Sequence, residues 1–282
     1  MNWSDRAAPP TSRRSVHRRS LTLLFVAIVA AITVVAACSS TSSSSTPAPT
    51  TTPRLRVVAT TTVLGDLARA VAGDRADVTT LMGPDDNPHT FVLPPDRQPE
   101  LDGADLVIQV GRAYEAGLAT ALDETRRAGT TVDETAPALA PITGADGQPD
   151  LHVWTDPDRL TTMADLLADA LADRSHSAPE PWQADAARYG ATLAAADEAA
   201  QAAINPIPDN HRVLASTSDG LTYLAQRYGF TVRAPVAAET ALIVDVDALR
   251  SSPPGPTTNA ELILQTTARI AEWLHHSSSP PG

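Results

Sequence analysis

The sequence predicts an α/β protein made of two lobes that one long helix joins. Short β-branched runs alternate with segments of helical apolar spacing from residue 55 to residue 134. The pattern of residues 56–73 returns at 212–232, where Arg-Val-Leu-Ala-Ser-Thr-Ser matches the earlier Arg-Val-Val-Ala-Thr-Thr-Thr. Between them, the alanine-rich residues 182–204 contain no proline and would span roughly 35 Å as a helix. The repeat is a single similarity, so coincidence is its alternative.

The N-terminal lobe is expected over residues 54–178. Its first strand is a β-branched run at 55–60, and apolar residues at helical spacing follow at 63–72. The later predicted elements are a strand at 78–82, a short helix at 96–102, a buried strand at 106–110, a helix at 114–128, a short strand at 131–134 and a helix at 160–173. A loop rich in proline and glycine separates the last two elements.

The linking helix is expected within residues 179–205, and a C-terminal lobe over residues 206–277. The predicted elements of this lobe are a strand at 212–216, a helix at 217–228, strands at 229–232 and 242–246, and a closing amphipathic helix at 260–274.

Residues 1–37 are predicted to be a lipoprotein signal peptide. Arginine pairs precede an apolar run at 21–37 that ends in Val-Ala-Ala-Cys, which resembles a bacterial lipobox. Cys38 is the only cysteine, which excludes an intramolecular disulfide and makes lipidation its expected role. The Ser/Thr/Pro-rich residues 38–53 are expected to be a disordered tether. The alternative is a permanent membrane anchor, although the run lies at the lower limit of spanning length.

The charge of the chain bounds its partners. Of 21 basic and 33 acidic residues, residues 1–37 hold five arginines and one aspartate. Their removal leaves 16 basic and 32 acidic residues, a formal charge of −16. A strongly acidic chain repels phosphate backbones, so nucleic acid is excluded as an expected partner.

Two histidines stand at positions where a ligand site is expected. His89 lies in the loop Gly-Pro-Asp-Asp-Asn-Pro-His-Thr-Phe-Val-Leu-Pro-Pro, which follows a predicted strand and which Pro84 and Pro88 stiffen. Crevices of open α/β sheets lie beyond such strand ends. His152 stands just ahead of a predicted helix. A lone loop histidine is otherwise a solvated surface residue, and that is the alternative for His89.

Several motifs in fixed order indicate a family. After the lipobox and tether come Arg-Val-Val-Ala-Thr-Thr-Thr-Val-Leu-Gly-Asp-Leu, Gly-Pro-Asp-Asp-Asn-Pro-His-Thr-Phe, Asp-Leu-His-Val-Trp-Thr-Asp-Pro, a long helix and Leu-Thr-Tyr-Leu-Ala-Gln-Arg-Tyr-Gly-Phe. This set resembles the metal-binding solute-binding proteins of bacterial ABC importers for zinc and manganese. The resemblance implies two α/β lobes with a metal cleft between them and a rigid joining helix. It also implies a monomeric, lipid-anchored protein on the extracytoplasmic face of the cell membrane, which delivers zinc or manganese to an ABC permease and is not an enzyme.

The resemblance further implies four metal ligands, two from each lobe. His89 matches the histidine of the family's Pro-His-Thr motif, and His152 matches that of its His-x-Trp-x-Asp-Pro motif. Asp247 matches the aspartate at the end of the last strand, and Asp245 is the alternative because a strand would place both on one face. Ser218 stands where the family has histidine or glutamate.

Two departures from the family pattern alter these expectations. The Ser218 hydroxyl is a poor ligand for a divalent cation, so water or Asp219 would take the fourth position. Residues 233–240 are too few for the helix, strand and helix that the resemblance implies, so the C-terminal lobe is predicted to be shortened. Zinc is expected over manganese, because zinc accepts three protein ligands and a water.

Other functions and roles stay open. A degenerate family member would be a non-transport accessory lipoprotein with weak or no metal binding, and the serine and the short lobe favour it. A metallohydrolase is disfavoured because no general-base motif accompanies the ligands. Asp156 is expected either to orient His152 or to cap the helix that follows. Glu115 is expected to be solvated at the start of a helix, and the alternative is that it faces the cleft.

Overall fold

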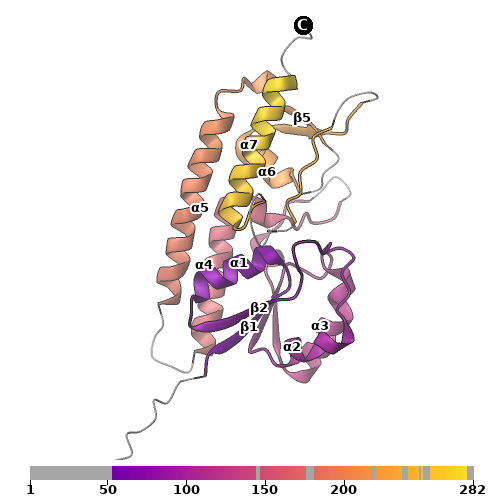
Figure 1. The fold of residues 1–282 in the computed structure, drawn as a ribbon, viewed down its shortest axis with the longest axis vertical. Coiled ribbons are helices and arrows are strands. Elements are labelled where there is room, and N and C mark those ends of the chain that lie inside the picture. Colours follow the sequence, from indigo (N-terminus) through magenta and orange to yellow (C-terminus); the bar gives the residue numbers. More distant parts are fainter. Residues whose placement is uncertain are drawn as a thin grey trace, which may run out of the picture. The chain divides into compact units, whose positions relative to one another are not determined.

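The N-terminal lobe is built on a four-stranded parallel sheet (Figure 1). The computed structural model describes residues 53–143, 147–175, 181–216, 220–236, 241–247, 249 and 255–277. The strands are β1 (Leu55–Ala59), β2 (Ala76–Thr80), β3 (Leu106–Gln109) and β4 (Thr131–Glu134). Their order in the sheet is β2-β1-β3-β4, and each neighbouring pair is parallel. The predicted α/β class is confirmed.

Helices cover both faces of this sheet, because its central strands are apolar on both sides. The helices are α1 (Thr62–Ala72), α2 (Gln98–Asp102), α3 (Ala119–Ala128) and α4 (Pro157–Arg174). Val57 and Ile108 belong to the core that contains the apolar faces of α1 and α4. Val58 and Val107 belong to a second core with the buried leucines of α2 and α3. Successive side chains of a strand point to opposite faces, so a continuous apolar run fills both cores.

The long helix α5 (Trp182–Ile204) joins the two lobes. It packs against α4 and α1 of the N-terminal lobe and against α7 (Asn259–Ser277), which lies beside it in Figure 1. The Tyr189 hydroxyl donates to the Asp66 carboxylate of α1 (3.1 Å), and the Asn259 side chain donates to that hydroxyl (2.7 Å). The predicted helix is confirmed, and one buried polar network ties its middle to both lobes.

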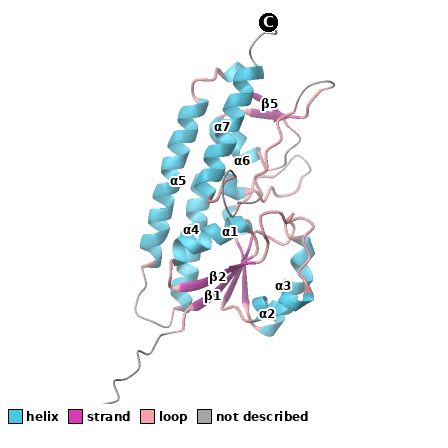
Figure 2. Ribbon diagram, in the orientation of Figure 1, coloured by secondary structure: helices cyan, strands magenta, loops and turns pink. Residues whose placement is uncertain are grey.

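The C-terminal lobe is small. It contains α7, the parallel pair β5 (Val213–Ala215) and β6 (Thr231–Arg233), and the short helix α6 (Thr222–Tyr228) between the two strands. Figure 2 shows this pair far from the four strands of the other lobe. Among the described residues its sheet has two strands.

Two element predictions in this lobe are wrong. Residues 242–246 do not form the predicted strand. Leu242 still donates to the Ala215 carbonyl (2.9 Å), but the Val246 carbonyl accepts from Trp154 Nε1 (2.7 Å), so the segment leaves the sheet edge to pack on the N-terminal lobe. The helix predicted at 217–228 begins instead at Thr222, and residues 217–219 lie outside the described residues.

The expectation for Glu115 is also wrong. The predicted helix at 114–128 starts with an irregular turn and a 3-10 segment, Ala116–Leu118, before α3. Glu115 is fully buried in that turn, where its carboxyl group accepts hydrogen bonds from the Thr60 hydroxyl and the Gly111 N–H. The turn therefore faces the sheet rather than solvent.

The predicted signal peptide, Cys38 and the tether up to residue 52 lie outside the described residues. In the part of the chain that the structure describes, no helix combines the length and the apolar character needed to cross a bilayer.

Candidate metal centre

His89 is presented by a loop that two polar side chains hold in place. The Asp86 carboxylate accepts a hydrogen bond from the Gly83 N–H (2.7 Å), and the Asn87 side chain accepts one from the N–H of His89 itself (2.9 Å). Asp and Asn form such local turns readily. The loop lies beyond the carboxyl end of β2, and His89 is exposed there.

His152 precedes the 3-10 turn Val153–Thr155 and is held by Asp150. Its Nδ1 lies 2.7 Å from Asp150 Oδ1, and the same oxygen accepts from the His152 N–H (3.0 Å). Burial is the largest influence on the Asp150 pKa and raises it, but hydrogen bonds from His152 outweigh burial, and the pKa is lowered. An ionised carboxylate only accepts hydrogen bonds. Nδ1 of His152 can therefore donate its proton to Asp150, and in a neutral ring of that tautomer Nε2 offers a lone pair.

Asp247 reaches the same place from the C-terminal lobe. Its N–H donates to Asp245 Oδ1 (3.0 Å), so these residues form a turn instead of the alternating strand that the sequence predicts. The carbonyl of the preceding Val246 accepts from the buried Trp154 indole, which fixes this turn against the N-terminal lobe. Asp245 supports the turn and is not one of the three side chains that converge.

Ligand atoms of His89, His152 and Asp247 all lie within 4.8 Å of one another. His152 Nε2 and Asp247 Oδ1 are 3.4 Å apart, and both are buried with no hydrogen-bond partner among the described residues. Two ligand atoms of one tetrahedral zinc ion, each bound at about 2.1 Å, lie roughly 3.4 Å apart. The geometry suits a single cation with these three ligands.

Charge also favours a cation here. A lone pair and a carboxylate that face each other across 3.4 Å repel unless a proton or a metal ion lies between them. Burial raises the pKa of Asp247, which shows that its negative charge lacks full solvation. A divalent ion would satisfy both buried atoms at once.

Tyr114 forms one wall of the cluster. Its ring meets His89 edge-on at 4.5 Å between centroids and meets His152 edge-on at 5.3 Å. Burial, and then the negative charge of Asp247, raise its pKa well above the usual range. The phenol is therefore neutral and can donate a hydrogen bond at this site. Tyr114 could not be singled out from the sequence, because helical spacing alone does not distinguish a wall residue from a core residue.

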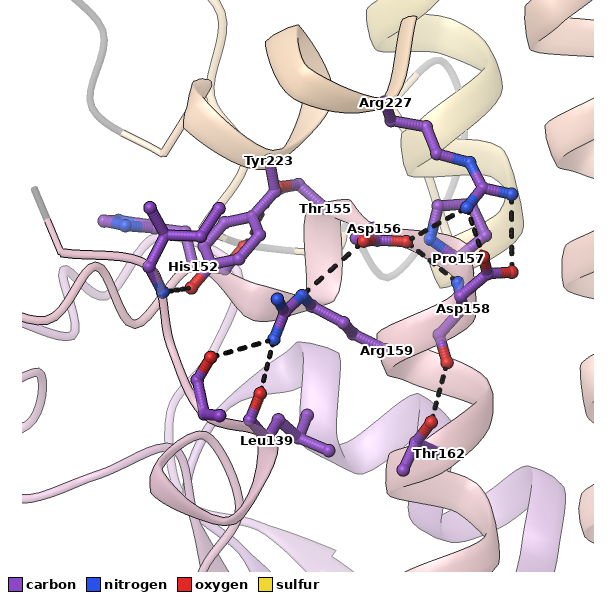
Figure 3. A network of polar contacts seen from close by, with 12 residues as sticks. Leu139, His152, Thr155, Asp156, Pro157, Asp158, Arg159, Thr162, Tyr223 and Arg227 are labelled. Atoms are coloured by element: carbon purple, nitrogen blue, oxygen red, sulfur yellow. Dashed lines mark hydrogen bonds and ion pairs between the residues drawn. The ribbon is translucent and has the colours of Figure 1, made fainter.

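Asp156 does not orient His152. It caps α4, where its side chain accepts from the Asp158 N–H (3.0 Å) and pairs with Arg159 (3.5 Å). Figure 3 shows the Asp156 carboxylate turned toward Arg159 and Arg227 and away from the His152 ring. The capping alternative is confirmed for Asp156, and the carboxylate on the imidazole belongs to Asp150.

The remaining candidate ligands are Ser218 and Asp219, and both lie outside the described residues. Gly220 follows them directly and lies against the His152 ring, where its backbone is left-handed with φ of 74°. The Gly220 carbonyl accepts from the Thr155 hydroxyl (3.3 Å). The segment that carries the two candidates therefore ends in contact with the His152 turn.

A family model described as the periplasmic component A of the zinc-uptake complex, ZnuA, matches residues 57–266. The chain belongs to this family. The match includes both lobes and all three converging side chains.

Relatives of this ZnuA-family chain are named for the binding of different metals. The manganese-binding lipoprotein MntA of Bacillus subtilis is 27% identical over 183 residues, 64% of this chain and 60% of that protein. The iron-binding protein YfeA of Yersinia pestis is 25% identical over 179 residues, 63% of this chain and 58% of that protein. The aligned part thus spans less than two thirds of these relatives.

Solved structures share the fold of this ZnuA-family chain. The periplasmic zinc-binding protein TroA from Treponema pallidum superposes with a TM-score of 0.70 at 16% identity, over 79% of this chain and 99% of that chain. A cadmium-bound periplasmic metal-binding protein from candidatus Liberibacter asiaticus gives 0.68 at 18% identity, over 78% and 100%. At this identity the likeness shows two α/β lobes and a joining helix.

Proposed function

We propose that this protein is a lipid-anchored substrate-binding protein that captures a divalent transition metal for an ABC importer. The observation that carries the proposal is the convergence of His89, His152 and Asp247, with two buried acceptor atoms 3.4 Å apart. The names of relatives, which refer to manganese, iron and zinc binding, support the same class of ligand. A solute receptor needs no catalytic base, so the proposal excludes an enzyme.

Zinc is the metal that we propose over manganese. Two imidazoles and one carboxylate suit both ions, but zinc accepts three protein ligands with water in the fourth position. Manganese favours more oxygen ligands. The fourth place falls to water or Asp219, because Ser218 offers only a neutral hydroxyl.

The division of the chain follows from this function. We propose that residues 1–37 direct export, that Cys38 is acylated and that residues 38–53 form the tether to the membrane. Residues 54–178 and 206–277 then form the two lobes, with 179–205 as the link. The monomer would present its bound metal to the permease on the extracytoplasmic face of the cell membrane.

The second candidate is an accessory lipoprotein that kept the fold and lost strong binding. The serine at position 218 and the two-stranded sheet of the C-terminal lobe favour it. The measured metal affinity decides between the candidates.

Isothermal titration of the detergent-purified chain with zinc and with manganese tests the proposal. We expect one ion per chain, with zinc bound more tightly. His89→Ala and Asp247→Ala should each weaken zinc binding at least tenfold, about 1.4 kcal/mol. His211→Ala, at an exposed histidine outside the cluster, is the matched control. All variants should also carry His275→Ala and His276→Ala, which removes adventitious binding at the C-terminal histidines. Equal affinity in the His89 and His211 variants would contradict the site.

A further inference from the structure

The Asp150 carboxylate contacts Nδ1 of His152, the ring nitrogen opposite the one that faces Asp247. Both side chains are 11% exposed, and Asp150 Oδ1 is 2.7 Å from Nδ1 of the ring. The opposite ring nitrogen, Nε2, faces Asp247 Oδ1 at 3.4 Å. The imidazole thus stands between two carboxylates, one from each lobe, and a neutral ring has a single proton to share between them.

The backbone on both sides of Asp150 is held. Its N–H donates to the Ile142 carbonyl (2.8 Å), and its own carbonyl accepts from the Tyr223 hydroxyl (2.7 Å). The same hydroxyl accepts from the Ile142 N–H (2.9 Å), so Ile142, Asp150 and Tyr223 form a closed ring of hydrogen bonds. Tyr223 belongs to α6 of the C-terminal lobe and is fully buried, and Figure 3 shows it beside the His152 segment. The Asp150 carboxylate is therefore a fixed acceptor.

The two tautomers of His152 have opposite consequences. With the proton on Nδ1, the ring donates to Asp150 and leaves the Nε2 lone pair aimed at Asp247. With the proton on Nε2, the ring would donate to Asp247, and the two ligand atoms would satisfy each other. The first tautomer keeps the site open to a cation, and the second closes it.

We infer that Asp150 is a positioning residue that holds the Nδ1–H tautomer of His152, so that Nε2 and Asp247 stay available to a divalent metal ion. The inference rests on the proposed function and deepens it by naming what prepares the site before the metal arrives. A carboxylate on the far nitrogen of a metal-binding imidazole also increases the basicity of the ligand.

Nuclear magnetic resonance of the metal-free full chain in detergent, with ¹⁵N-labelled histidine, reads the tautomer directly. The spectra are taken at mildly alkaline pH, where imidazole is ordinarily neutral, and His152→Gln assigns the signal by its loss. Wild type should show Nδ1–H. Asp150→Asn should also show Nδ1–H, because the amide oxygen still accepts. Asp150→Ala should show Nε2–H, because Asp247 is then the remaining acceptor.

Zinc titration of the same proteins tests whether the tautomer affects metal binding. Asp150→Ala should lower zinc affinity about 10- to 100-fold, and Asp150→Asn should lie between it and wild type. Asp209→Asn, at an aspartate with a side chain 95% exposed, is the control for a generic loss of charge. Thermal melting identifies any variant that fails to fold, and the Asp150→Asn comparison then carries the test alone.

The inference is overturned if Asp150→Ala keeps Nδ1–H, or if folded Asp150→Ala binds zinc as wild type does. If Asp150→Ala does not fold, zinc binding by Asp150→Asn equal to that of wild type overturns it. Failure of the proposed function gives a different result, in which wild type binds neither zinc nor manganese. The tautomer of the metal-free protein still decides the role of Asp150 in that case.

Discussion

Gly220 packs directly on the His152 ring. A Cβ at this position would lie 2.7 Å from His152 Cδ2 and 2.7 Å from Val246 Cγ2, and φ of 74° disfavours any L side chain. The only side chain small enough to leave the ring in place is therefore hydrogen. A larger residue at this position would push the imidazole out of its place in the cluster.

Gly220→Ala is expected to destabilise the protein by about 3 kcal/mol, since a left-handed alanine costs about 1–2 kcal/mol and overpacking about 1–3 kcal/mol. Zinc affinity should fall at least tenfold as the ring shifts. Gly147→Ala is the matched control, because Gly147 has φ of 79° but a Cβ added there would meet no atom within 4 Å. Urea unfolding and zinc titration measure both. Equal losses of stability and of zinc affinity in the two variants would show that backbone strain alone acts at Gly220.

Glu115 is a buried carboxyl group next to the wall residue Tyr114. Burial is the main cause that raises its pKa to about 7 from 4.5, and its hydrogen bonds with Thr60 and Gly111 only partly oppose the shift. Between these two pH values the folded chain holds a proton that the unfolded chain has released. Stability from this group is therefore complete below about pH 4.5 and falls as pH rises through 7.

Glu115→Gln should remove that fall. The free energy of unfolding of wild type should drop relative to the variant by up to about 3 kcal/mol between pH 4.5 and pH 7, at about 1.4 kcal/mol per pH unit. Urea unfolding of metal-free protein at a series of pH values measures the difference, and other titrating groups cancel in it. Parallel pH profiles of the two proteins would rule out Glu115 as the source.

The short helix α6 is held to the rest of the molecule by Arg227. The guanidinium donates to both oxygens of Asp197 on α5 (3.0 and 2.6 Å), bonds to Asp158 at the start of α4, and lies 3.6 Å from Asp156. Figure 3 shows it between the Asp156 and Asp158 carboxylates. The Tyr228 hydroxyl also donates to Asp197 (3.0 Å). A helix of two turns cannot persist alone, so these bonds fix it beside the His152 turn.

Arg227→Met should cost about 3 kcal/mol, because Asp197, with a side chain 20% exposed, is left without its cation, and Asp156 keeps only its pair with Arg159. Arg112→Met is the control. It breaks a pair with Asp123, but the arginine side chain is 54% exposed, so the loss should stay below about 1 kcal/mol. Chemical denaturation of both variants gives the comparison. A loss at Arg227 no larger than at Arg112 would show that packing alone holds α6.

Elements with local causes were predicted well. The alanine-rich, proline-free run places α5 at its predicted bounds, and the β-branched runs locate β1, β3 and β4 to within one residue. Residues 242–246 are an apolar, β-branched run typical of a strand, yet the Val246 carbonyl accepts a hydrogen bond from the Trp154 indole instead of from the sheet edge. The partner that outweighs the local pattern lies 92 positions earlier in the chain, beyond the reach of any periodicity.

The attachment of the whole molecule to a membrane depends on Cys38 under our proposal. Cys38→Ser removes the thiol that would be acylated. Without the acyl chains, the mature chain has no proposed attachment to the bilayer. We expect the variant in the soluble or secreted fraction, as fractionation and immunoblotting would measure. A membrane-bound variant with an uncut N-terminus would identify the run at 21–37 as an anchor helix instead. Wild type treated in the same way is the reference.

The sequence by itself determined the α/β class, the order of most elements and the long helix, because each follows from local composition, local spacing or motif order. It also nominated His89, His152 and Asp247, which the structure brings together. Only the tertiary structure decided that Asp150 rather than Asp156 faces the imidazole, and that Glu115 is buried. Both aspartates flank His152 in the chain, but Ile142 and Tyr223 hold the backbone of Asp150, and Asp156 forms an ion pair with Arg227. The direction of a side chain depends on neighbours that folding supplies, and so the second carboxylate of the site could not be chosen from spacing.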